Sequence, residues 1–348
     1  MNNSNNKKYK IKGLNLQEIQ EWIESIGEKP YRARQLYSWM YQKGVRSLGE
    51  MTNLSKKFRD RYKSYLEVSA LSLNKKVVSK DQKTTKYLFN LNDRYSIESV
   101  YMIEGKRVTI CLSTQVGCPI GCSYCATGLM GFRRNLTAGE IIDQFLWINS
   151  NESRPITNVV FMGMGEPFLN YDNTIKAAQI LNSELGPEIA KRRITISTCG
   201  ILPAMHRYTE ERHGFKLAVS LNGSNDKQRS EMIPVNKKYP IKKILEAAMF
   251  YTQKMKKHIT FEYVLIADFN DSDDDAKQLV KIISPIPCKL NIIPYNQNSY
   301  FPFRSPSEDR VNCFIEKVYK APFTVTVRRS KGGEISAACG QLYTENTT

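Results

Sequence analysis

The spacing of apolar residues changes character near residue 108. From there onward, short apolar runs rich in β-branched residues alternate with segments whose apolar residues recur at helical spacing. This alternation predicts right-handed βαβ units and a parallel sheet, either open or closed into a barrel. Strands are predicted at 108–114, 158–162, 193–197, 216–221, 260–266, 289–293 and 323–327, and helices at 138–149, 173–183, 241–256, 273–283 and 307–319.

The first part of the chain follows a different pattern. Residues 1–12 are rich in Asn and Lys without an apolar centre, which predicts a disordered tail and no secretory signal. Residues 13–83 are predicted to form a small N-terminal helical domain. Basic and aromatic residues are interleaved there, which suits RNA binding, although most of the rings are expected to be core. Helical spacing is found in 16–26, 31–43 and 55–65.

A linking β-hairpin is predicted between the two parts. Residues 84–90 and 96–104 are strand-like and flank a turn at Asn92-Asp93-Arg94. We therefore place a hairpin at 84–104 and assign 105–348 to the α/β core. The first strand of this core leads into a cysteine-rich loop, and ligands of parallel α/β folds bind beyond the carboxyl ends of strands.

Charge and cysteine usage narrow the class of protein. The 348 residues carry a formal net charge of +17, which favours a polyanionic partner such as nucleic acid, with solvated basic faces as the alternative. The eight cysteines come without an export signal, so we expect a reducing, cytoplasmic location. The sequence contains no run of eighteen apolar residues, so no membrane helix is expected.

Cys118, Cys122 and Cys125 form the motif CxxxCxxC. Thiolates are soft ligands for zinc or an iron–sulfur cluster, and a structural zinc site normally has four ligands. No fourth ligand lies nearby, since the three histidines of the chain are far downstream. Three thiolates can hold three irons of a [4Fe–4S] cluster and leave the fourth iron open. The alternatives are a zinc loop and a chance group of buried thiols.

Several other residues are candidates for chemistry. Gly165 and Glu166 follow the second core strand, where a small residue allows a ligand to approach and a carboxylate can accept from an ammonium group. Cys339 lies among small residues, which favours an accessible, nucleophilic thiol. Polar or backbone groups at other strand ends could bind a ligand or cap the next helix. These are Ser197, Ser220, Leu221, Asn222 and Asn296.

Taken together, these segments resemble the RlmN family of radical S-adenosylmethionine (SAM) RNA methyltransferases. The resemblance covers most of the chain, and it rests on the ordered set rather than on any single piece. It implies an α/β fold: a radical SAM partial (β/α)6 barrel with a small N-terminal helical RNA-binding domain and a linking β-hairpin. The segments are 111–118, the CxxxCxxC motif with Ala126-Thr127-Gly128, Gly163–Pro167, 196–198, 218–221, 293–296 and 328–342.

The resemblance also implies a mechanism. Cys118, Cys122 and Cys125 would hold the [4Fe–4S] cluster, whose open iron binds SAM. A first SAM would methylate Cys339, and a radical made from a second would activate that methyl group to add to C2 of an adenine in 23S rRNA. Glu98 would remove the C2 proton, and Cys111 would attack Cys339 to release the RNA, leaving a transient disulfide bond. The implied SAM-contacting residues are Gly165, Glu166, Ser197, Ser220, Leu221, Asn222 and Asn296.

The implied partners are 23S rRNA, tRNA in dual-specificity members, and an electron donor such as flavodoxin; a cytoplasmic monomer is expected. Read without the family, Glu98 is a surface carboxylate of the hairpin.

Two rival functions stay open. One is a methyltransferase of the related Cfr type, acting at C8 of the same adenine, although Pro167 favours the RlmN type. The other is an iron–sulfur RNA-binding protein without methyl transfer, in which Cys111 and Cys339 have no role.

Overall fold

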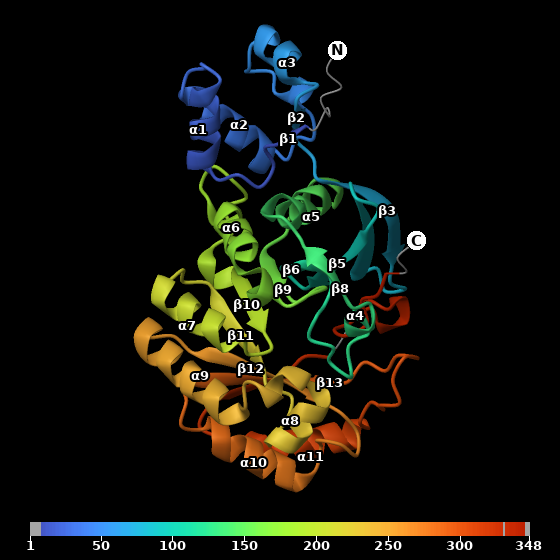
Figure 1. Ribbon diagram of the computed structural model, residues 1–348. Helices are drawn as coiled ribbons and strands as arrows, with labels where there is room; N and C mark the ends of the chain where they lie inside the picture. The colour runs from blue at the N-terminus through green and yellow to red at the C-terminus, as the bar shows by residue number, and fades with distance from the viewer. Residues whose placement is uncertain (1–7, 330, 345–348) are drawn as a thin grey trace.

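The computed structural model describes residues 8–329 and 331–344, and one curved sheet organises most of them (Figure 1). The strand order is β14-β13-β12-β11-β10-β9-β6-β5-β4-β3. From β6 to β14 all neighbouring strands are parallel. These strands are β6 (Arg107–Cys111), β9 (Asn158–Phe161), β10 (Ile194–Thr198), β11 (Lys216–Ser220), β12 (Ile259–Leu265), β13 (Cys288–Pro294) and β14 (Thr324–Val327).

A helix connects each parallel strand to the next, which gives six βα units and confirms the predicted partial (β/α)6 barrel. Several of these helices cover the outer face of the sheet in Figure 1. The connecting helices are α5 (Ala138–Asn151), α6 (Tyr171–Asn182), α7 (Leu202–Glu211), α9 (Ile241–Met255), α10 (Asp273–Ile283) and α11 (Glu308–Val318).

Smaller elements lie in the loops of the barrel. The sequence pattern predicted neither α7 nor the short helix α8 (Asp226–Met232), because both are brief and carry few apolar residues. After β6 the chain forms a hairpin of β7 (Gln115–Gly117) and β8 (Phe132–Asn135), which encloses helix α4 (Ala126–Leu129). Single 3₁₀ turns occur at Leu48–Glu50, Pro167–Asn170, Lys191–Arg193, Pro234–Lys237 and Gly333–Ile335.

The linking hairpin is part of the main sheet. Strands β4 (Thr84–Leu91) and β5 (Ser96–Glu104) match the prediction, and β5 pairs antiparallel with β6. A third strand, β3 (Leu71–Val78), lies at the sheet edge, within residues that the sequence analysis assigned to the helical domain. The sequence analysis missed this strand because most of its side chains are exposed and therefore give no apolar pattern.

The N-terminal helices α1 (Leu16–Ser25), α2 (Tyr31–Tyr41) and α3 (Lys56–Tyr62) form a separate module at one end of the molecule (Figure 1). Strand β1 (Tyr9–Lys10) joins this module by pairing with β2 (Leu66–Glu67), and the adjacent Ile11 is fully buried. The prediction of a disordered tail was therefore wrong for residues 8–12, while residues 1–7 lie outside the described part. Pairing with a distant strand supplied the order that the local sequence does not indicate.

A buried ion pair connects the N-terminal module to the barrel. Lys12 Nζ lies 3.3 Å from the Asp143 carboxylate on α5, which also accepts from the Ala70 backbone N–H at 2.8 Å. The backbones of Gly13 and Gly139 approach so closely that a Cβ on either would clash. This contact leaves little freedom for the module to move against α5. No helix within the described residues has the length and apolar character needed to cross a membrane.

Candidate functional site

The three clustered cysteines lie in the loop between β7 and α4, at the carboxyl end of the first parallel strand. Cys118 N–H donates to the Gly131 carbonyl at 3.0 Å, and Cys125 N–H donates to the Cys122 carbonyl at 3.1 Å. Gly128 packs so closely on Gly121 and Cys122 that a Cβ there would be 3.2 Å from the Gly121 Cα. The loop is thus folded back on itself, with the three thiols half-buried.

The donor set of this loop fits an iron–sulfur cluster. Burial raises the pKa of all three thiols, and a charge on Cys118 or Cys125 raises the pKa of Cys122 further. Three thiolates this close need cationic charge to be stable, which a metal cluster supplies. In the described residues no group of three His, Cys, Asp or Glu side chains has the arrangement needed to hold a single metal ion. A cluster does not require that arrangement, because each cysteine binds a different iron.

The C-terminal segment 338–344 packs against this loop, as the red chain beside α4 shows in Figure 1. Ala126 N–H donates to the Gly340 carbonyl at 2.7 Å, and the Thr127 hydroxyl donates to the Leu342 carbonyl at 2.7 Å. From the loop that follows β13, Asn296 Nδ2 donates to the Cys339 carbonyl at 3.2 Å. These bonds hold Cys339, exposed to solvent, beside the three-cysteine loop.

Glu98 on β5 belongs to the same site. Its interpretation as a surface carboxylate was wrong, because the side chain is buried between β4 and the C-terminal segment. One carboxylate oxygen lies 2.9 Å from Lys86 Nζ, and the other accepts from the Tyr343 backbone N–H at 3.0 Å. Burial raises the pKa of Glu98, and the Lys86 charge acts in the opposite direction.

Cys111 ends β6, is buried, and pairs with Val100 on β5 and with Val160 on β9. Burial and a charge on Cys339 raise the pKa of Cys111 to about 12, in opposition to the Arg328 charge, which lowers it. Desolvation of the Cys339 thiol by the surrounding protein raises its pKa to about 11. The structure does not support a disulfide bond at this pair, because both cysteines are free thiols.

The predicted SAM-contacting residues gather at the carboxyl ends of the parallel strands. Gly165 has a φ of +97°, and a Cβ there would clash with Gln115. Both oxygens of the buried Glu166 carboxylate already accept backbone N–H groups, from Phe168 at 2.9 Å and from Cys199 at 2.8 Å. Glu166 therefore shapes the strand end, and a ligand amine would share its oxygens.

Asn222 has an internal role that its sequence position does not suggest. Its φ is +57°, its Nδ2 donates to the Tyr124 hydroxyl at 2.7 Å, and its Oδ1 accepts from the Val264 N–H at 2.9 Å. The side chain thus connects the cysteine loop to β12. Ser197 and Ser220 lie at the ends of β10 and β11, and the buried Leu221 directly follows β11.

Sequence reasoning missed Arg229 on α8. Its fully buried guanidinium donates to three backbone carbonyls, those of Leu221 at 3.0 Å, Ser220 at 3.3 Å and Cys199 at 2.5 Å. It thereby fixes the ends of β10 and β11. An arginine in a polar helical stretch gives no local signal of burial.

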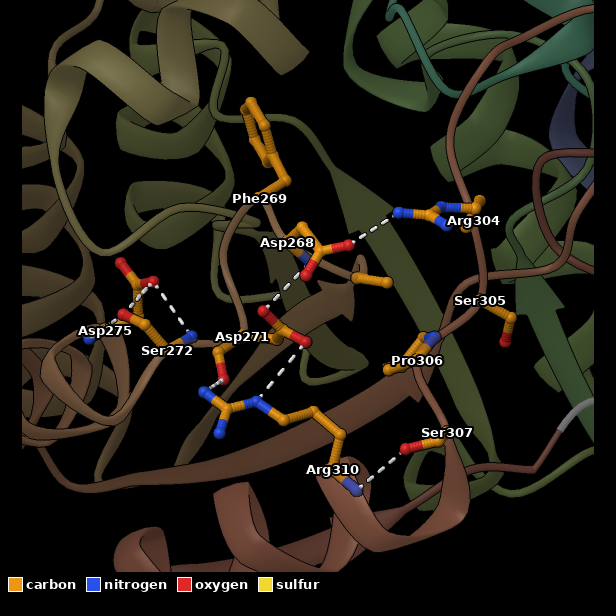
Figure 2. Close-up of a pocket in the computed structure, with 11 residues that line it drawn as sticks. Asp268, Phe269, Asp271, Ser272, Asp275, Arg304, Ser305, Pro306, Ser307 and Arg310 are labelled. Atoms are coloured by element: carbon orange, nitrogen blue, oxygen red, sulfur yellow. Dashed lines mark hydrogen bonds and ion pairs between the residues drawn. The ribbon is translucent and has the colours of Figure 1, made fainter.

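Apart from the cysteine site, a hollow of about 700 Å³ lies where α10 and α11 begin (Figure 2). Its arginines are already paired: Arg304 with Asp268 at 2.8 Å and Arg310 with Asp271 at 3.4 Å. Asp275 adds a further carboxylate to the lining. This surplus of acidic groups does not suit a polyanion, and the hollow lacks the cysteines of the site above.

Comparisons with known proteins point to one family. The model of the ribosomal RNA large subunit methyltransferase N-terminal domain matches residues 9–68, and the radical SAM superfamily model matches residues 112–280. The dual-specificity RNA methyltransferase RlmN of Syntrophobacter fumaroxidans is 45% identical over 338 residues, covering 96% of this chain and 98% of that protein.

Two further similarities extend this match. The protein of the same name from Geobacter sulfurreducens is 43% identical, over 95% of this chain and 91% of that protein. The crystal structure of a radical SAM methyltransferase from Sphaerobacter thermophilus superposes with a TM-score of 0.93 at 41% identity, covering 96% of this chain and 99% of that chain. Sequence and structure therefore agree along nearly the full length.

Proposed function

Because the chain belongs to the RlmN family of radical SAM RNA methyltransferases, we propose that it methylates C2 of a specific adenine in 23S rRNA and an adenine in tRNA. The methyl group is carried by Cys339. The observation that carries this proposal is the packing of the Cys339 segment on the three-cysteine loop, through the bonds from Ala126 and Thr127. An iron–sulfur protein that only bound RNA would not need this arrangement.

Cys118, Cys122 and Cys125 hold the cluster, and the carboxyl ends of β9, β10, β11 and β13 form the SAM pocket. When bound, the cluster and SAM supply the methyl group and the radical that activates it, chemistry that no side chain can provide. The pocket residues are Gly165, Glu166, Ser197, Ser220, Leu221, Asn222 and Asn296.

Three side chains act directly on the RNA and on the methyl carrier. The Cys339 sulfur bears the carbon that becomes bonded to adenine C2. Glu98, whose carboxylate is held by Lys86 and Tyr343, removes the proton from C2, and the unpaired electron that radical addition leaves on the base would return to the cluster. The Cys111 thiolate then attacks the Cys339 sulfur, so that an S–S bond forms and the S–C bond breaks with its electron pair moving to carbon. Protonation of that carbon completes the methyl group.

The surface charge supports RNA as the partner, whereas the electron donor, the monomeric state and the location are proposed from the family resemblance. The N-terminal module presents exposed Lys56, Lys57 and Arg61, which suit the phosphate backbone of folded RNA. A small electron-transfer protein such as flavodoxin supplies the reducing electron, and the enzyme acts as a cytoplasmic monomer.

The test follows labelled methyl groups. Reconstituted protein is incubated with methyl-labelled SAM, reductant and a 23S rRNA fragment, and the label is located in protein and RNA. We expect label on Cys339 without RNA and in both once RNA is added, whereas Cys339→Ala should label neither. Label reaching RNA at the normal rate in Cys339→Ala would refute the carrier role. Label in neither wild-type protein nor RNA would favour the non-methylating alternative.

A further inference from the structure

Arg328, which directly follows β14, contacts residues that neighbour Cys111 and has no strong partner of its own. Its backbone N–H donates to the Ile292 carbonyl at 2.8 Å, which continues the β13–β14 ladder. Its guanidinium contacts two thioethers, Met162 Sδ at 3.6 Å and Met102 Sδ at 4.0 Å. Each methionine lies two residues beyond a residue that pairs with Cys111, Val160 or Val100, so the guanidinium lies on the same face of the sheet as the Cys111 side chain. Thioether sulfur is a weak acceptor, so these contacts satisfy little of the donor capacity of an arginine.

The neighbouring basic residues differ from Arg328 in this respect. Arg329 pairs with Glu308 at 2.7 Å, and Lys331 pairs with Glu104 at 3.5 Å. Among residues 8–329 and 331–344, no carboxylate lies within ion-pair distance of the Arg328 guanidinium. A half-buried cation that is left without an anion is costly unless an anion forms beside it during function.

Three titratable groups of the site are sensitive to the Arg328 charge: Cys111, Cys339 and Glu262. The Arg328 charge lowers the pKa of each of them, in opposition to burial. Glu262 on β12 accepts from Asn291 Nδ2 at 2.6 Å, and its pKa is raised by burial. Cys111 receives a second stabilising influence from the backbone of Met162, whose side chain touches Arg328.

We propose that Arg328 is a positioning residue for the thiol exchange, in which its guanidinium stabilises the Cys111 thiolate that attacks the Cys339 sulfur. This inference rests on the proposed function, because only product release requires that thiolate. A nearby opposite charge shifts a pKa by about 1–3 units, while a more acidic thiol is a weaker nucleophile with a Brønsted slope of about 0.4–0.5. Together these effects predict that Arg328 accelerates the exchange by about 3- to 50-fold.

The exchange can be measured without RNA or SAM. Dithiobis(nitrobenzoate), an aromatic disulfide with a coloured thiolate product, reacts with the exposed Cys339 of cluster-loaded protein in a Cys313→Ser background. The reaction leaves a mixed disulfide on Cys339 and releases one coloured thiolate. Attack by Cys111 then forms the Cys111–Cys339 disulfide and releases a second, whose rate reports the exchange. Cys111→Ala should abolish the second release only.

We expect Arg328→Gln and Arg328→Met to slow the second release by about 3- to 50-fold, with the iron content nearly unchanged. The first release should slow as well, because the Arg328 charge also lowers the pKa of Cys339. Only the second release reports Cys111, since Cys339 is already in the mixed disulfide at that stage. Arg328→Lys, which retains the charge, should keep most of the rate. Arg329→Gln is the matched control and should behave as wild type.

Wild-type rates in Arg328→Gln would overturn the proposal. Equal losses in Arg328→Lys and Arg328→Gln would also overturn it, since shape and not charge would then matter. Because no methyl transfer is involved, failure of the proposed function would leave this result interpretable.

Discussion

The backbone N–H of Tyr343 donates to the carboxylate of Glu98 at 3.0 Å, although 245 residues separate them in the chain. This bond attaches the segment that carries Cys339 to strand β5, while Asn296 attaches it to the loop after β13. It also directs one Glu98 oxygen toward the C-terminal segment while Lys86 holds the other. The proposed base and the proposed methyl carrier are therefore positioned by the same contact.

Removing Lys86 should shift the acid limb of the pH–rate profile. Glu98 acts as a base only when ionised, above its pKa, and the Lys86 charge lowers that pKa. Lys86→Ala therefore raises the pKa of Glu98, moves the limb to higher pH, and reduces the rate most strongly at low pH. The measurement is the single-turnover rate of RNA methylation by pre-methylated enzyme. Lys83→Ala, an exposed neighbour, is the control; an unshifted limb in Lys86→Ala would exclude Glu98 as the titrating base.

Replacing Glu98 itself should leave the first half of the reaction intact. Glu98→Gln keeps the shape of the side chain but cannot accept the C2 proton, so RNA methylation should fall by about 10²- to 10⁴-fold. Methylation of Cys339 should continue, as peptide mass spectrometry can show. If RNA methylation in Glu98→Gln stays within a few-fold of wild type, another group must serve as the base.

Cys111→Ala should trap the protein on its RNA. The sulfur of the adduct leaves only when a thiolate attacks it, so a covalent protein–RNA species should accumulate. A denaturing gel with labelled RNA detects this species directly. Cys339→Ala, which lacks the carrier, should form none. Normal turnover by Cys111→Ala without a trapped species would make Cys111 an ordinary core thiol.

Alanine at Cys118, Cys122 or Cys125 should abolish cluster binding. Each thiolate is expected to hold a different iron, so loss of one leaves too few protein ligands. Iron content and the visible spectrum after anaerobic reconstitution measure this. Cys313→Ala, on the exposed face of α11, should retain full iron. Full iron in Cys122→Ala would contradict the assignment.

The N-terminal module should contribute salt-dependent RNA affinity. A truncation would remove strands of the main sheet, so charge substitutions are the cleaner test. Replacing Lys56, Lys57 and Arg61 with Gln should weaken RNA binding and reduce the salt slope by about one per lost phosphate contact. The same change at the exposed Lys242 on α9, Lys281 on α10 and Lys320 just after α11 is the control. Equal effects from both triple variants would indicate non-specific attraction.

The sequence predicted the barrel well because its strands and helices carry clear apolar periodicity. Strand β3 was missed because an exposed edge strand has no such pattern, and β1 because it is ordered only by pairing with β2. The cysteine loop was found because its spacing is itself the signal. The burial of Glu98 and the position of Arg328 depend on contacts with distant segments, which no local pattern encodes.

The most direct test is mass spectrometry of nucleosides from 23S rRNA and tRNA of a strain that lacks its own enzyme and expresses this chain. We predict that 2-methyladenosine returns in both RNAs with the wild-type protein and in neither with Cys339→Ala. The appearance of 8-methyladenosine would instead identify a Cfr-type enzyme. Absence of both modified nucleosides, with the protein expressed and loaded with iron, would contradict the assignment as a methyltransferase.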